Sequence, residues 1–122
     1  MYKVIWLAKF REDMPREEVL EWWRGPHADL AKATPGMLRY VQSHWTHALD
    51  RGTALEAGEP FYDGHAEHWF ADRAAYEAAM ASPQWHLCVE DGPTGFANAA
   101  IGGALEETVI SWHPMDDGRT TG

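Results

Sequence analysis

Apolar positions along the chain follow two periods, one typical of strands and one typical of helices. The run from Tyr2 to Phe10 (YKVIWLAKF) is rich in β-forming residues and apolar on both parities, which indicates a strand covered on both faces. From Val19 to Ala31 apolar side chains recur every three to four residues, which predicts an amphipathic helix. We expect Asp13 to cap this helix and Pro15 to lie in its first turn.

The helical stripe is interrupted at Gly25-Pro26 and then resumes in phase, so we expect a kink or a restart there rather than an end. Pro35-Gly36 is expected to end the helix. A second strand is predicted from Met37 to His47. Residues 49–61 show no periodicity and are expected to form a mobile loop.

The second half of the chain repeats this order of elements. Tyr62 to Phe70 reads as the third strand, and Asp72 is expected to cap a helix that ends near Met80. Ser82-Pro83 predicts the start of a short helix. The last strand is expected from Glu106 to Pro114.

The order β-α-β, repeated, predicts an α+β fold: a ferredoxin-like βαββαβ arrangement with both helices on one face of a four-stranded antiparallel sheet. Residues 1–114 would form this single domain, and residues 115–122 a polar tail. Because both faces of the strands carry large apolar residues, the face without helices needs a cover. A second copy of the chain is the simplest cover, so we expect a homodimer whose facing sheets enclose a cavity on each subunit.

Composition narrows the classes of partner. Formal net charge is −9 and the 10 basic residues are scattered, so neither nucleic acid nor an anionic membrane is expected to bind. The single cysteine, Cys88, excludes an internal disulfide and fits a reducing compartment. With no signal peptide and no apolar run long enough to span a bilayer, we expect a cytoplasmic protein. Seven Trp residues suggest a ring-lined pocket or a subunit interface.

Three residues form a plausible acid–base set. On the second strand Tyr40, Gln42 and His44 share one face, and on the third His68 and Phe70 do the same. His27 lies at the border of the helical stripe, where it could reach a pocket. An imidazole near its unperturbed pKa of about 6.5 can give or take a proton, and a phenol can donate to a carbonyl or an enolate. His27, Tyr40 and His68 are therefore the candidate catalytic residues. The candidate substrate contacts are His44, Gln42, Phe70, Trp6 and Trp23.

Structural roles stand beside these functional ones. His27 could be a surface or capping group, and Tyr40 and His68 could simply fill the core. Glu67 could orient a histidine or pair with Arg39 or Arg73. We expect Cys88 to pack in the core, and His86 and His113 to lie on the surface. Which face of the sheet Trp6 and Trp112 occupy stays open.

Metal chelation is not indicated by the spacing of the histidines. The two H-x-x-H pairs, His44/His47 and His65/His68, would each straddle a regular strand. The sequence also contains no phosphate-binding glycine loop, nucleophile elbow or zinc signature.

Two motifs resemble the signatures of EthD-like proteins. PHADLAKATPGMLRYVQSH (26–44) carries a helical His followed by Pro-Gly and an Arg-Tyr strand, and YDGHAEHWFADRAAYEAAMASPQW (62–85) carries Asp-Gly, a Glu, an aromatic pair and Ser-Pro. The resemblance covers about residues 2–113. It implies a dimeric α+β barrel related to muconolactone-type isomerases and to aromatic polyketide cyclases and dehydratases. It also implies a proton-transfer role for His27, with Tyr40 as the tyrosine of the strand motif.

Two positions depart from this pattern. Asp29 replaces a proline two residues after the histidine; its carboxylate could orient a nearby imidazole or face solvent. His68 stands where many members have an aliphatic residue, which favours an acid–base role.

The sequence thus leaves three hypotheses. The first is a cofactor-independent isomerase, cyclase or dehydratase (lyase) that moves protons on a planar, carbonyl-containing aromatic or lactone. The second is a barrel that binds haem or a transition metal through His27, His44 or His68. The third is a non-catalytic accessory or ligand-binding protein of a degradation or biosynthetic pathway.

Overall fold

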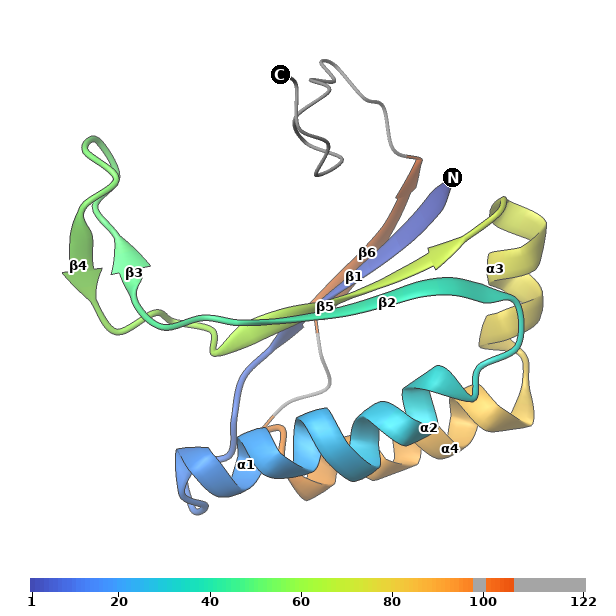
Figure 1. Cartoon of the computed structure of the whole chain (residues 1–122), viewed down its shortest axis with the longest axis horizontal. Coiled ribbons are helices and arrows are strands. Elements are labelled where there is room, and N and C mark those ends of the chain that lie inside the picture. Colours follow the sequence, from blue (N-terminus) through green and yellow to red (C-terminus); the bar gives the residue numbers. More distant parts are fainter. Residues whose placement is uncertain (98–100, 107–122) are drawn as a thin grey trace, which may run out of the picture.

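A four-stranded antiparallel sheet forms the centre of the computed structural model, which describes residues 1–97 and 101–106 (Figure 1). The strand order is β2-β5-β1-β6. Their bounds are Tyr2–Ala8 (β1), Met37–His44 (β2), Gly64–Phe70 (β5) and Ile101–Glu106 (β6). The predicted α+β class and antiparallel sheet are confirmed.

All helices of the described chain lie toward one face of this sheet (Figure 1). The first helical segment consists of α1 (Arg16–Trp22), η1 (Trp23–His27) and α2 (Ala28–Lys32). The second consists of α3 (Arg73–Met80), α4 (Pro83–Asp91) and the short η2 (Gly92–Thr94). Helices α2 and α4 run side by side beneath the strands. None of the described helices is long and apolar enough to cross a membrane.

Two of the three predicted helix caps are confirmed. The Asp72 side chain accepts a hydrogen bond from the backbone N–H of Ala75, and Ser82 accepts one from Trp85. The prediction for Asp13 is wrong: α1 begins at Arg16 with no side-chain cap. Asp13 instead forms a bidentate ion pair with Arg11, which occupies both carboxylate oxygens.

The predicted kink at Gly25-Pro26 is confirmed. Gly25 has φ −106° and ψ −105°, outside the helical region, and the segment around it has π-helical hydrogen bonding. A proline cannot donate to the helical ladder, which accounts for the irregular turn. The helix then resumes as α2, which ends at Lys32, before the end predicted at Pro35-Gly36.

The remaining boundaries differ in part from expectation. Residues 49–61 are not a plain loop, because β3 (Ala48–Leu49) and β4 (Glu56–Gly58) form a small hairpin. The fourth sheet strand covers 101–106, so it starts before the predicted 106–114 segment. The rest of that segment, with Trp112 and His113, lies outside the described residues.

The predicted sorting of side chains by strand parity is confirmed. The register aligns Tyr40 with His68, and Gln42 and Trp6 with Ala66, so these residues share the helix-covered face. Phe70 lies in the core on this face with 0% of its surface exposed.

The opposite face carries Glu67, for which the predicted partners are wrong. It pairs with Lys3 at 3.4 Å and lies 3.5 Å from the His65 ring, not beside Arg39 or Arg73. Glu67 therefore cannot orient a histidine on the helix-covered face.

Candidate active site

A cavity of 330 Å³ lies between the sheet and the pair α2 and α4. It forms within one chain, and the expectation that two facing sheets enclose a cavity on each subunit stays a prediction. Its wall is mostly apolar and aromatic. The lining residues are Trp6, Ala8, Trp23, His27, Ala31, Tyr40, Ala66, His68, Trp85, Cys88, Val89, Gly92, Pro93 and Phe96.

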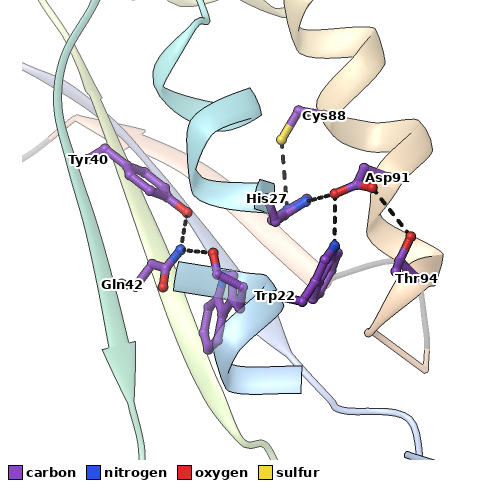
Figure 2. Close-up of polar contacts among 8 residues, drawn as sticks. Trp22, His27, Tyr40, Gln42, Cys88, Asp91 and Thr94 are labelled. Atoms are coloured by element: carbon purple, nitrogen blue, oxygen red, sulfur yellow. Dashed lines mark hydrogen bonds and ion pairs between the residues drawn. The ribbon is translucent and has the colours of Figure 1, made fainter. Parts of the chain in front are cut away.

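His27 reaches this wall from the irregular turn of η1, and its side chain is held by Asp91 (Figure 2). The distance from His27 Nδ1 to Asp91 Oδ2 is 2.9 Å. The same Asp91 oxygen accepts from Trp22 Nε1 at 3.0 Å, and its other oxygen accepts from Thr94 Oγ1 at 3.3 Å. Three donors from three segments thus fix the carboxylate at the end of α4.

The carboxylate determines which nitrogen of His27 can act as a base. Because Asp91 can only accept, Nδ1 carries the proton in the neutral ring and Nε2 keeps its lone pair. Nε2 faces Cys88 Sγ at 3.8 Å on the cavity side. Burial lowers the pKa of His27 below its usual value, and Asp91 partly offsets this by favouring the charged ring. At neutral pH His27 is therefore a neutral base with its proton held by Asp91.

Tyr40 presents a hydroxyl to the same cavity from β2. Gln42 Nε2 donates to the Tyr40 oxygen at 2.7 Å and to the backbone oxygen of Trp23 at 2.7 Å (Figure 2). Since the phenol oxygen accepts this bond, its own proton stays available for a ligand. Burial raises the pKa of Tyr40 to about 12, so the hydroxyl is a neutral donor.

His68 lies deeper, on β5, with 3% of its surface exposed. Its ring contacts Tyr40 and Trp85, with centroid distances of 5.0 and 5.3 Å. His68 Nδ1 and Trp6 Nε1 are buried and have no hydrogen-bond partner among the described residues. Unpaired buried polar groups are costly, so an oxygen atom of a ligand or a water would be favourable beside each.

Burial lowers the pKa of His68 to about 4, and this predicts a loss of stability in acid. Between pH 6.5 and about 4 the unfolded chain binds a proton that the folded chain does not, so the free energy of unfolding falls as pH falls. The effect amounts to about 3 kcal/mol across this range. We expect His68→Leu to remove that part of the pH dependence, measured by urea unfolding of both proteins from pH 7 to pH 4. Parallel curves for the two proteins would contradict this.

The structure brings together five of the residues singled out from the sequence: His27, Tyr40, His68, Trp6 and Trp23 all line the cavity. Three expected substrate contacts do not line it. Gln42 and His44 lie behind the wall, where the His44 ring donates to Gln42 Oε1 at 2.9 Å, and Phe70 is enclosed in the core.

Asp29, the second candidate for orienting a histidine, faces solvent and pairs with Lys32 at 3.2 Å. The carboxylate that does orient His27 is Asp91, which the sequence analysis did not single out. The signal that could have found it is the helical position of Asp91, three residues after Cys88, on the same side of α4 as the buried stripe.

The three histidines considered as metal ligands are not assembled into a chelating group. His44 packs on the Trp23 ring outside the cavity, at a centroid distance of 4.8 Å. Across the described ranges, no group of three or more His, Cys, Asp or Glu side chains could hold a metal ion.

Solved structures share this fold at low sequence identity. An EthD (ethyl tert-butyl ether D) family protein from Bacillus halodurans has 20% identity and a TM-score of 0.70, over 88% of this chain and 99% of that one. A dabb family protein with a ferredoxin-like fold from Mesorhizobium loti has 12% identity and a TM-score of 0.64, over 88% and 97% of the two chains.

A third structure, described as a dimeric ferredoxin-like protein of unknown function from Thermobifida fusca, has 17% identity and a TM-score of 0.55, over 85% and 88% of the two chains. Comparison with curated protein sequences finds no significant match. The EthD domain matches residues 11–100, which include both helical segments, the kink, and the cavity residues on β2, β5 and α4. The chain therefore belongs to the EthD domain family.

Proposed function

We propose that this protein is a cofactor-independent acid–base enzyme of the isomerase, cyclase or dehydratase (lyase) type. Its substrate would be a planar, largely apolar molecule with a carbonyl group, either an aromatic compound or a lactone, as the resemblance to muconolactone-type isomerases and polyketide cyclases implies. The observation that carries the proposal is the His27–Asp91 pair, which keeps the lone pair of His27 Nε2 on the cavity side, beside Cys88 Sγ, in a cavity that also contains the Tyr40 hydroxyl.

The geometry supports proton transfer next to a carbonyl. His27 Nε2 takes a proton from the carbon beside the carbonyl, and the electrons of that C–H bond form an enolate. Tyr40 donates its hydroxyl proton in a hydrogen bond to the developing oxyanion, and the apolar wall strengthens that bond. The imidazolium, stabilised by Asp91, returns the proton to another atom of the same ligand. An isomerisation of this kind needs no oxidant, reductant or added cofactor.

The unpaired groups at the floor of the cavity support a ligand with a second oxygen atom. Trp6 Nε1 is a donor, and neutral His68 can either donate or accept. A hydroxyl or carbonyl oxygen placed there would satisfy groups that are buried without partners among the described residues. Rings of Trp6, Trp23, Trp85 and Phe96 supply flat apolar surface for the remainder of the molecule.

Exchange of protons for deuterium tests the proposal even while the natural substrate is unidentified. In D₂O, a panel of bicyclic aromatic ketones (2-tetralone first) and unsaturated lactones would be followed by NMR with and without the protein. We expect exchange at the carbon beside the carbonyl to rise in proportion to protein concentration. Binding of these probes without any exchange would instead favour a non-catalytic ligand-binding protein. A Soret band in the purified protein would favour the haem hypothesis.

We also propose that two copies pair through the sheet face that carries no described helix; two structures that share this fold are described as dimeric. This face carries half-buried apolar side chains of Ile5, Leu7 and Val41 beside the Lys3–Glu67 pair. Light scattering after size exclusion should give the mass of a dimer. Val41→Glu places a carboxylate next to Glu67 on this face and should shift the mass to that of a monomer. Leu87→Glu, on the exposed side of α4, is the matched control and should leave the dimer intact.

A further inference from the structure

Cys88, the single cysteine of the chain, is placed in line with the base and its carboxylate. Its Sγ lies 3.8 Å from His27 Nε2, and His27 Nδ1 lies 2.9 Å from Asp91 (Figure 2). A thiol, an imidazole and a carboxylate in this order form the arrangement by which a nucleophile is activated through an adjacent base. Proton transfer at carbon uses only the last two members, so the thiol has no part in the function proposed above.

Cys88 packs in the core, as predicted, and it also lines the cavity. Cys88 is 3% exposed to bulk solvent, yet it lines the cavity, and Tyr40 packs against the cluster of buried residues that contains it. The same cavity holds His68, whose Nδ1 is buried and unpartnered among the described residues. A molecule bound beside His68 and Tyr40 would therefore lie within reach of the sulfur as well.

We propose that Cys88 is a nucleophile that adds reversibly to α,β-unsaturated carbonyl compounds bound in the cavity. The S–C bond forms at the β carbon, the C=C electrons move to give an enolate, and the thiol proton passes to His27 Nε2. Tyr40 donates to the enolate oxygen. His27 then delivers the proton to the α carbon and the carbonyl re-forms. The product is a thioether, all atoms are accounted for, and the reverse steps release the ligand.

An unsaturated carbonyl compound is the electrophile that this site favours. Burial raises the pKa of the Cys88 thiol to about 12, so the resting sulfur is a neutral thiol that needs a base in contact with it. His27 supplies that base at the moment of attack. The carbonyl oxygen of the unsaturated compound then receives a hydrogen bond from Tyr40. The apolar rings of the cavity accommodate a conjugated, flat molecule.

Intact-mass spectrometry with 2-cyclohexen-1-one is the direct test. We expect one adduct per chain. It should form faster than the adduct of glutathione with the same enone at the same pH, and its rate of formation should saturate as the probe concentration rises. Cys88→Ser should remove the adduct. His27→Gln should slow its formation by about 10²-fold, since general-base assistance is lost. His86→Gln, an exposed histidine on the same helix as Cys88, is the matched control and should leave the rate unchanged. Asp91→Asn provides a second variant should His27→Gln fail to fold.

Alkylation by iodoacetamide distinguishes activation of the enone by Tyr40 from activation of the Cys88 sulfur by His27. Alkylation by this probe forms no enolate, so Tyr40→Phe should slow addition to the enone and leave alkylation nearly unaffected. Equal adduct rates in the wild type and His27→Gln, or addition slower than with glutathione, would overturn the proposal. The site is shared with the proposed function but the readouts are separate. If the protein catalyses deuterium exchange but forms no enone adduct, only the proposal for Cys88 is wrong. If it forms the adduct but catalyses no exchange, only the proposed proton-transfer function is wrong.

Discussion

Replacement of His27 by Gln should reduce the rate of ketone proton exchange by 10²- to 10⁴-fold, the range typical of a lost general base. Gln can keep an amide N–H beside Asp91 Oδ2, so the carboxylate at the end of α4 retains a donor from η1 beside those from Trp22 and Thr94. What Gln lacks is a nitrogen lone pair that accepts a proton near neutral pH. The measurement is the initial exchange rate by NMR at equal protein concentration.

The appropriate comparison is His86→Gln, which makes the same chemical change at an exposed site on α4. That variant should exchange protons at the wild-type rate. If His27→Gln also retained more than a tenth of the wild-type rate, His27 would not be the base, and its contacts with Asp91 and Cys88 would be only structural.

Asp91 acts through His27 and is a positioning residue, so its variant should change the pH dependence as well as the rate. Asp91 favours the charged imidazolium and raises the pKa of His27 against the lowering caused by burial. In Asp91→Asn that support is lost. The acidic limb of the pH–rate profile, which reports protonation of the base, should therefore move to lower pH. A merely structural effect would lower the rate and leave the limb in place.

The sequence could predict the parts of this site that depend on local periodicity. Strand parity grouped Tyr40 with Gln42 and His68 with Phe70, because successive side chains in a strand alternate between its two faces, and the observed register then puts Tyr40 opposite His68. The Gly25-Pro26 kink was equally predictable, since a proline in the interior of a helix cannot donate to the hydrogen-bond ladder. Periodicity also put His27 at the edge of the apolar stripe, and the structure shows that edge buried against α4.

The parts that depend on tertiary packing were not predictable in this way. Asp91 and His27 are 64 positions apart, and they meet only because α4 packs beside η1 and α2. Sequence proximity favoured Asp29, but two residues along a helix turn a side chain to the far side, toward solvent. Parity also could not decide which sheet face the helices cover. For that reason the sequence could not show that a cavity lies between the sheet and the chain's own helices.

Trp23→Ala should lower the free energy of unfolding by about 3–5 kcal/mol, the typical cost of truncating a buried aromatic ring to alanine. The side chain is 1% exposed. Its ring meets Phe10 and Phe96 edge-on, at centroid distances of 5.7 and 5.4 Å, and packs on His44 at 4.8 Å. The sheet makes room for it with a glycine: a Cβ at Gly64 would lie 2.9 Å from the ring. Few atoms could move into the space that the ring leaves.

A loss of this size is a large fraction of the total stability of a small domain, which is about 5–15 kcal/mol. The effect should be measured by urea unfolding followed by circular dichroism, since the substitution removes a fluorescent residue. Both proteins should be compared at equal concentration, because the proposed dimer would contribute to stability. Leu87→Ala, where the side chain is 54% exposed, is the matched truncation and should change the free energy by less than about 0.5 kcal/mol.

Trp23→Phe tests how much of the lost stability comes from a single aromatic ring at this position. Phe retains one ring between Phe10 and Phe96 and should recover more than half of the lost stability, while still widening the cavity wall. The main-chain oxygen at this position accepts from Gln42, which also donates to Tyr40, so collapse of the wall would disturb the hydroxyl that faces the ligand. We therefore expect Trp23→Ala to lose proton exchange even at temperatures where it remains folded. A folded Trp23→Ala protein with wild-type stability would show that the wall is not formed by this ring.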